Sequence, residues 1–360
     1  MIVPDRVAKE SVMKALLCTR LGPPESLVLT EGLPSPKPSA GEVKLQVLVA
    51  GINFPDTLII EGKYQFKPDL PFAPGGEAVA RVAELGEGVE GLAVGDRVIA
   101  CNAFGMLAEE VCLPASQVIK LASPKLSDLE AGGFLMTYAT SYYALKQRGG
   151  LRAGETLAVL GASGGVGLAA VQLGKVMGAK VIACASTDAK LAVCKAQGAD
   201  ILINTRTQEL KDALKAATNG DGVDVVYDPV GGTQSEEAVR ALAWGGRLLV
   251  VGFASGSIPQ LPLNLTLLKN CAVVGVFWGA YAAREPENFR QDMAELLALV
   301  DAGRLKPVIS GSFPLARGGE AIRQLADRKA IGKVVVTVGF VTEHEAKYPK
   351  AAKALATESD

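Results

Sequence analysis

The sequence contains a single histidine among its 360 residues, His344, which lies in a polar stretch near the C-terminus. A Ser-His-Asp triad, a Cys-His pair and a histidine-ligated zinc ion each need an imidazole that is held in a pocket. A residue so close to the end of the chain is a poor candidate for that task. The composition therefore disfavours hydrolysis by a nucleophilic triad and zinc chemistry that depends on histidine.

Closely spaced cysteine pairs are missing as well. None of the six cysteines belongs to a C-x-x-C pair, so the sequence shows neither a four-cysteine zinc lobe nor a redox dithiol. We expect reduced thiols that behave as small, mostly buried hydrophobic side chains, as is typical of cytosolic proteins. They stand at positions 18, 101, 112, 184, 194 and 271.

An excess of charge of one sign is absent, because 37 basic residues face 38 acidic ones. No global field attracts nucleic acid or an anionic membrane. The first 11 residues lack the apolar core of a secretion signal. One uncharged run that is long enough to cross a bilayer, residues 156–174, contains five glycines, which favours a buried strand and helix over a membrane span. We expect a cytoplasmic protein without a nucleic-acid or membrane partner.

Two different patterns follow each other along the chain. Between residues 13 and 121, apolar residues alternate with polar ones, as in Val43, Leu45, Val47 and Val49, which predicts β-strands closed into a barrel or sandwich. After Ser123, apolar strand-like runs alternate with amphipathic helical ones, which predicts a parallel sheet covered on both faces. A prior of about 150 residues per domain also suggests two domains.

A glycine-rich segment joins a predicted strand, residues 156–160, to a predicted helix. Its A-x-G-x-x-G pattern fits a dinucleotide turn, in which backbone N–H groups and the helix N-terminus approach a pyrophosphate. A tight turn of purely structural purpose is the alternative. The residues predicted to bind the cofactor here are Ala162, Ser163, Gly164, Gly165, Val166 and Gly167.

The end of the next predicted strand indicates which dinucleotide is bound. An acid about 20 residues after the last glycine would bind the ribose diol of NAD, but Ser186 stands 19 residues after Gly167, and Lys190 follows it. Hydroxyl groups and a lysine suit a 2′-phosphate, so we predict NADPH, although Asp188 lies nearby. Alternatively, Ser186 only caps the next helix and Lys190 is a solvated surface charge.

These residues resemble the zinc-independent branch of the medium-chain dehydrogenase/reductase superfamily, namely the NADPH:quinone oxidoreductase family that includes zeta-crystallin. The likeness is most specific at residues 162–167, followed by Gln172 and Lys175. It implies a GroES-like β-barrel catalytic domain of residues 1–135 and 280–341, a Rossmann NADPH-binding domain of residues 136–279, and an active site in the cleft between them. Residues 342–360 are charged and aperiodic, which predicts a flexible tail.

The same resemblance implies chemistry without a metal. Zinc-dependent members carry ligands in a G-I-C and a G-H-E segment, and this chain has Asn53 and Gly76 at those two ligand positions. The resemblance also implies that Asn53 and Tyr64, which follows 11 residues later, are the catalytic residues and supply hydrogen-bond donors. Leu58 replaces a tyrosine common in bacterial quinone reductases, which makes the pocket more apolar. Without the resemblance, Asn53 is an Asx-turn residue and Tyr64 a rim aromatic.

Further cofactor contacts are implied by the resemblance at single positions. They involve the nicotinamide, its ribose and the 2′-phosphate. The residues concerned are Thr140, Thr205, Arg206, Gly252, Phe253 and Arg328.

The combined pattern predicts direct hydride transfer from NADPH to a quinone or an α,β-unsaturated carbonyl. A reductase of 2-enoyl thioesters such as enoyl-CoA is the alternative within the same mechanism, and an NADPH-binding protein without physiological turnover is an alternative of another class. The apolar residues 271–278 read as a strand at a sheet edge, which predicts a homodimer.

Overall fold

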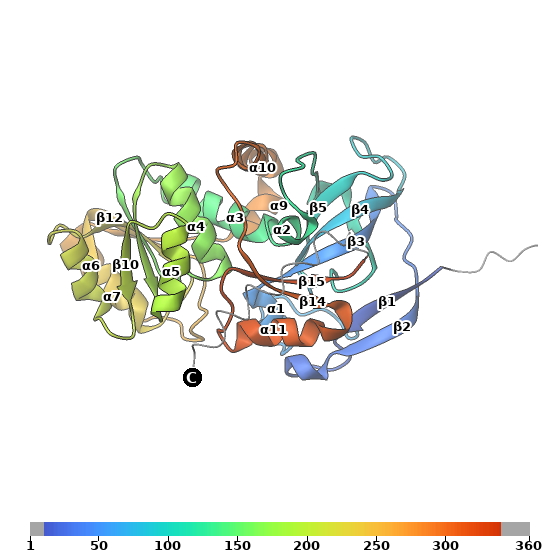
Figure 1. The fold of residues 1–360 in the computed structure, drawn as a ribbon, viewed down its shortest axis with the longest axis horizontal. Helices are drawn as coiled ribbons and strands as arrows, with labels where there is room; N and C mark the ends of the chain where they lie inside the picture. Colours follow the sequence, from blue (N-terminus) through green and yellow to red (C-terminus); the bar gives the residue numbers. More distant parts are fainter. Residues whose placement is uncertain (1–10, 340–360) are drawn as a thin grey trace, which may run out of the picture. The chain divides into compact units, whose positions relative to one another are not determined.

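The computed structural model describes residues 11–339 of the chain. His344 and the predicted tail lie outside the described residues. Within them, the chain forms two compact units (Figure 1). Unit 1 comprises residues up to Ala122, Ser312–Arg328 and the residues from Val334 on, and unit 2 comprises Ser123–Gly311 and Lys329–Lys333. The domain boundaries at residues 135 and 280 stay a prediction.

Unit 1 is built mainly of antiparallel strands. Seven strands form one sheet in the order β14-β15-β3-β4-β5-β7, with β6 paired to β3, and β1 and β2 form a separate pair. The strands are β1 (Val12–Leu17), β2 (Val28–Pro34), β3 (Glu42–Ile52), β4 (Glu77–Leu85), β5 (Arg97–Cys101), β6 (Glu110–Pro114), β7 (Val118–Lys120), β14 (Ile309–Pro314) and β15 (Lys333–Thr337). Two helices, α1 (Phe54–Ile59) and α11 (Gly318–Ala326), and three 3₁₀ turns, η1 (Pro24–Ser26), η2 (Ala115–Gln117) and η4 (Leu315–Arg317), complete it.

Strand β3 is the central strand of this sheet. Val43, Leu45, Val47 and Val49 are completely buried, as their alternation predicts, while Gln46 between them is exposed. Toward its C-terminal end the strand is buried on both faces, and β4 and β15 pair with it there along its two edges. The residue after the strand is therefore delivered to a rigid, interior position.

Unit 2 contains a six-stranded sheet in the order β10-β9-β8-β11-β12-β13, and its strand pairs are parallel. The strands are β8 (Thr156–Val159), β9 (Lys180–Ala185), β10 (Ile201–Asn204), β11 (Val223–Asp228), β12 (Leu242–Val250) and β13 (Ala272–Gly275). The helices are α2 (Asp128–Gly132), α3 (Leu135–Tyr142), the π-helical segment η3 (Tyr143–Arg148), α4 (Gly165–Val176), α5 (Asp188–Ala196), α6 (Leu210–Ala217), α7 (Thr233–Ala241), α8 (Asn264–Lys269), α9 (Trp278–Arg284) and α10 (Pro286–Asp301).

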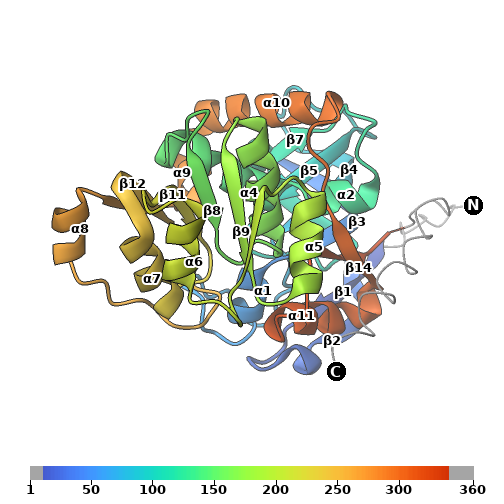
Figure 2. The same cartoon turned by 60° about the vertical axis from the view of Figure 1, so that its left-hand side comes forward.

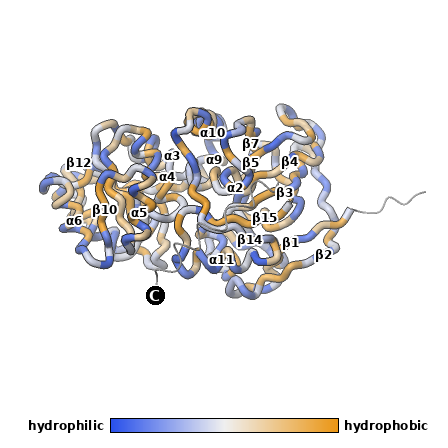
Figure 3. The backbone as a smooth tube through the Cα atoms, in the orientation of Figure 1, coloured by the Kyte–Doolittle hydropathy of each residue, from blue (hydrophilic) through white to orange (hydrophobic). Residues whose placement is uncertain are grey.

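The alternation of strands and helices predicted after Ser123 is confirmed. Helices α4 and α5 lie over β8, β9 and β10, as Figure 2 shows. Figure 3 shows the strands of this sheet as mostly hydrophobic segments between helices of mixed character, as expected for a sheet covered by helices.

Some boundaries differ from those the sequence suggests. Helix α7 ends at Ala241, and Leu242, although apolar, already has the extended backbone of β12. The apolar run after Asn270 forms a strand only over Ala272–Gly275, and Trp278 already belongs to a helix. Apolar character alone does not distinguish the end of a strand from the start of a buried helix.

The uncharged run at residues 156–174 forms β8 and part of α4. Among residues 11–339, no helix combines the length and apolar character of a membrane span. All six cysteines are free: Cys18, Cys184 and Cys194 are buried, and the other three are half-buried.

Candidate active site

The glycine-rich turn of unit 2 leads from β8 into α4. Gly161 has a positive φ of 56°, which reverses the chain. Ala162 N–H then donates to the Cys184 carbonyl of the neighbouring strand (3.0 Å), and Gly164 N–H donates to the Gly161 carbonyl (3.0 Å). Gly164 is the N-cap residue of α4, so the turn ends with the first N–H groups of a helix, which lack partners within that helix.

Two glycines of this turn are needed for different reasons. A Cβ on Gly167 would lie 2.3 Å from the Gly161 carbonyl oxygen, so only glycine fits there. A Cβ on Gly164 would meet that oxygen at 3.4 Å, an ordinary contact, and its φ of −76° suits any residue. The fold does not require glycine at position 164. A ligand that approaches the turn would require it, which favours the dinucleotide interpretation over a purely structural turn.

The predicted 2′-phosphate residues gather at the carboxyl ends of β9 and β10. Thr205 follows β10, and its N–H donates to the Ala185 carbonyl (2.9 Å) at the end of β9. Burial lowers the pKa of Lys190, and the positive charge of Arg206 lowers it further. Two cations therefore lie close enough to repel each other, and a bound dianion would relieve that repulsion.

The alternatives at this end of the site can now be judged. Thr187, and not Ser186, is the N-cap of α5, and its side chain accepts from Lys190 N–H (3.3 Å). The hydroxyl of Ser186 is thus not needed as a helix cap. Asp188 accepts a hydrogen bond from Asn204 Nδ2 (2.7 Å), so a protein donor already engages the one acid in this segment.

Three other predicted cofactor residues also lie in unit 2. Thr140 is on α3, and Gly252 and Phe253 follow β12, where Gly252 N–H donates to the Asp228 carbonyl (3.3 Å). Arg328 belongs to unit 1, where it follows α11 with a positive φ of 58°. The cofactor contacts of these four residues stay predictions.

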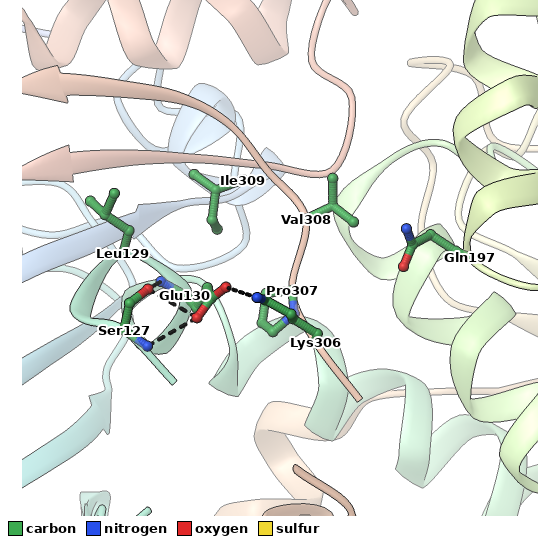
Figure 4. A pocket seen from close by; sticks show the side chains of 8 residues that line it. All are labelled: Ser127, Leu129, Glu130, Gln197, Lys306, Pro307, Val308 and Ile309. Atoms are coloured by element: carbon green, nitrogen blue, oxygen red, sulfur yellow. Dashed lines mark hydrogen bonds and ion pairs between the residues drawn. The ribbon is translucent and has the colours of Figure 1, made fainter. Parts of the chain in front are cut away.

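A separate cavity of about 220 Å³ in unit 2 contains none of the predicted residues (Figure 4). Glu130 and Lys306 form an ion pair in its wall (3.2 Å), and Glu130 also accepts from the Ser127 N–H (2.9 Å). The other lining residues are Leu129, Gln197, Pro307, Val308 and Ile309. Because its charged groups are paired with each other, the cavity offers no evident recognition chemistry.

In unit 1, the predicted catalytic residues lie at opposite ends of the short helix α1. Asn53 directly follows β3 and is the N-cap residue of α1. Tyr64 lies in the loop after the helix and is half-buried. Burial raises the pKa of the Tyr64 phenol, and the Asp56 carboxylate and the Cys101 thiol raise it further. The phenol is therefore protonated at neutral pH and can act as a donor.

Tyr64 and Asn53 differ in whether their donor groups already make hydrogen bonds within the protein. Within residues 11–339 the Tyr64 hydroxyl makes no hydrogen bond. The Asn53 Nδ2, in contrast, donates to Glu77 Oε1 (2.8 Å) and lies 3.4 Å from the Gly51 carbonyl oxygen. Sequence reasoning missed Glu77 as a partner of Asn53. Glu77 directly follows Gly76, which stands at the histidine position of zinc-dependent relatives. That place in the sequence could have indicated Glu77 as a residue near Asn53.

Metal-ligand chemistry finds no support in this region. Across the part of the chain that the structure describes, no group of three or more His, Cys, Asp or Glu residues could hold a metal ion. Zinc independence stays a prediction, because it concerns the active enzyme.

Comparison with known proteins identifies the family. A profile described as the alcohol dehydrogenase GroES-like domain matches residues 39–123, and one described as zinc-binding dehydrogenase matches residues 165–300. A quinone oxidoreductase-like protein 2 homolog from Nematostella vectensis is 40% identical over 326 residues, covering 90% of this chain and 88% of that protein. The chain belongs to the medium-chain dehydrogenase/reductase family, in its zeta-crystallin-like quinone oxidoreductase branch.

Further similar proteins and solved structures support this assignment to the family. Human quinone oxidoreductase is 30% identical, with 91% of this chain and 98% of that protein covered. The solved structure of a probable oxidoreductase from Mycobacterium abscessus is 40% identical, with a TM-score of 0.83 over 91% of this chain and all of that one. A mycobacterial protein complexed with NADPH gives 30% identity and a TM-score of 0.84 over the same shares.

The predicted family and fold class, a GroES-like domain plus a Rossmann parallel-sheet domain, are confirmed. The chain is a member of an oxidoreductase family that binds a nicotinamide cofactor.

The two glycines of the turn give a test of ligand approach. We expect Gly164→Ala to keep the wild-type melting temperature, because its Cβ has room, but to weaken dinucleotide binding at least about 10-fold by blocking the pyrophosphate. Gly167→Ala should instead lower the melting temperature itself. Thermal melts and fluorescence titration with NADPH measure both effects. Unchanged binding by a stable Gly164→Ala protein would return the turn to a structural role.

Proposed function

We propose that the protein transfers hydride from NADPH to quinones or α,β-unsaturated carbonyl compounds without a metal ion. The observation that carries the proposal is the half-buried Tyr64 hydroxyl, which makes no hydrogen bond within residues 11–339. A nucleotide turn that could accommodate a side chain at position 164, and yet has none, supports a ligand on unit 2.

The chemistry divides between cofactor and protein. NADPH, when bound, supplies the hydride, and the protein holds the acceptor and donates to the oxygen on which negative charge develops. Tyr64 is the proposed donor to that oxygen, and it is also the proposed source of the proton for the α-carbon when a carbon-carbon double bond is reduced. Asn53 is the second proposed catalytic-site residue.

The proposed preference for NADPH rests on the two cations beside Ser186. We expect Lys190→Ala to weaken NADPH binding by about 10- to 100-fold, the value of a charge-assisted contact, and to leave NADH binding nearly unchanged. Lys195→Ala removes an exposed lysine from the same helix and serves as the control. Calorimetry with both cofactors measures the difference. Equal losses for NADPH and NADH would show that Lys190 does not contact the 2′-phosphate.

Turnover itself is tested by NADPH oxidation with a quinone, an enone and crotonyl-CoA. A clear preference for crotonyl-CoA would favour the enoyl-thioester alternative, and binding without any turnover would favour a non-enzymatic role.

Metal independence is tested by the same assays, run before and after treatment with a chelator. The zinc content of the protein is measured by elemental analysis in both cases. Stoichiometric zinc whose removal abolishes turnover would overturn that part of the proposal.

The role of Tyr64 differs between the acceptor classes. Tyr64→Phe should lower kcat by about 10²- to 10³-fold for enones and enoyl thioesters, because both a donor and a proton are lost. Quinones should be affected less, since a hydroquinone oxygen can take its proton from water. Tyr143→Phe, which changes a half-buried tyrosine of unit 2, is the matched control. If Tyr64→Phe leaves kcat unchanged for every acceptor, Tyr64 is a rim aromatic.

We also propose a homodimer in which β13 pairs with the same strand of a second copy. Strand β13 is the edge of its sheet, and Val273 and Phe277 are 42% and 61% exposed. An exposed apolar edge is typical of strand pairing between chains. Val273→Lys should shift the sedimentation coefficient from dimer to monomer, while Lys195→Ala should not. A wild-type monomer at micromolar concentration would contradict the proposal.

A further inference from the structure

Hydrogen bonds join two separate segments of unit 1 into a ring. In the first segment, Asn53 Nδ2 donates to Glu77 Oε1 (2.8 Å), and Asn53 N–H donates to Asp56 Oδ2 (2.7 Å). The second segment begins at Gly75, whose N–H donates to Asp56 Oδ1 (3.0 Å), and reaches Glu77 two residues later. The ring closes through Asn53, Asp56, Gly75 and Glu77.

Both carboxylates of the ring are removed from solvent. The residue exposure is 0% for Glu77 and 2% for Asp56. Burying a carboxylate is costly unless donors surround it, so these contacts are specific pairings and not incidental ones. Asn53 presents its NH₂ group to Glu77, whose Oε1 accepts the hydrogen bond. An aspartate at position 53 would place two buried carboxylates against each other.

The ring lies where the resemblance puts metal ligands in zinc-dependent relatives. Asn53 stands at the cysteine position of one ligand segment, Gly76 at the histidine position of the other, and Glu77 follows directly. A metal ion bound by two segments holds them together. In this chain, a hydrogen bond from the Asn53 amide to the Glu77 carboxylate connects the same two segments.

Helix α1 joins Asn53 to the loop that contains the proposed proton donor. Asn53 directly precedes the helix, so the ring fixes the point where α1 begins. At the other end, Gly62 N–H donates to the Ile59 carbonyl (3.1 Å) and Lys63 N–H to the Leu58 carbonyl (2.9 Å). Tyr64 is the next residue after these bonds.

We propose that Glu77 and Asn53 are positioning residues, whose hydrogen bond replaces the metal as the link between the two segments and sets the position of Tyr64 through α1. The inference rests on the proposed function, in which Tyr64 donates to the substrate. It assigns Asn53 an indirect role, in contrast to the direct donor role that the sequence suggests. Misplacing a reacting group by about 1 Å can cost about 10²-fold in rate.

A reciprocal exchange of the two side chains tests the proposal. Asn53→Asp should lower kcat/KM for an enone by about 10²-fold or more and lower the melting temperature, because two carboxylates then face each other. The double variant Asn53→Asp/Glu77→Gln re-forms the bond with donor and acceptor exchanged. It should recover kcat/KM to within about 10-fold of wild type, mainly through kcat, and recover the melting temperature. Glu90→Gln, at an exposed glutamate, controls for loss of a negative charge.

Each result bears on one part of the proposal. Recovery of stability without recovery of kcat would show that Asn53 donates directly to the substrate, and would overturn the positioning role. Variants that lose stability while kcat and KM stay at wild-type values would reduce the ring to a purely structural element. If none of the tested acceptors supports NADPH oxidation by the wild-type protein, the proposed function is wrong. In that case recovery of the melting temperature by the double variant still decides whether the bond links the two segments.

Discussion

The close approach of the Gly161 carbonyl to Gly167 is the constraint on which the cofactor half of the molecule depends. A Cβ on Gly167 would lie 2.3 Å from that oxygen. The first turn of α4 therefore packs against the end of β8 more closely than any side chain at position 167 would allow. The N-terminus of α4, with Gly164 as its N-cap residue, follows the carboxyl end of β8 at the carboxyl edge of the sheet. The ends of β9 and β10 share that edge because parallel strands all run in the same direction. Ser186, Lys190, Thr205 and Arg206 therefore follow the strands that end at this edge.

Much of this arrangement could be predicted from the sequence, because it follows from local rules. A glycine pattern between an apolar strand and an amphipathic helix implies the turn, and a fixed spacing leads from Gly167 to Ser186. The parallel sheet follows from the alternation of strands and helices. The alternation of Val43, Leu45, Val47 and Val49 likewise identified the central strand of unit 1. These features depend on periodicity and on spacing along the chain, and both can be read from one sequence.

The partners of Asn53 could not be predicted in the same way. Glu77 is 24 residues away along the chain, and only the pairing of β3 with β4 brings the two together. The sequence therefore suggested a free amide donor at position 53, whereas the structure shows an amide bound to a buried carboxylate. The end of strand β13 at Gly275 escaped prediction for a similar reason, since the packing of the following segment decides where an apolar run leaves the sheet.

The cations at Lys190 and Arg206 and the buried carboxylates at Asp56 and Glu77 differ in how much stability is lost when one of them is replaced. Arg206 is exposed and Lys190 only half-buried, so water and salt screen their charges and replacing either one costs little stability. Asp56 and Glu77 are buried, and an unmatched group at either position leaves a carboxylate without its donor, which costs several kcal/mol. A single substitution at Lys190 or Arg206 is therefore compatible with the fold. At the buried ring, replacing Asn53 or Glu77 alone breaks their hydrogen bond at a cost in stability, and only a paired exchange of the two side chains keeps it.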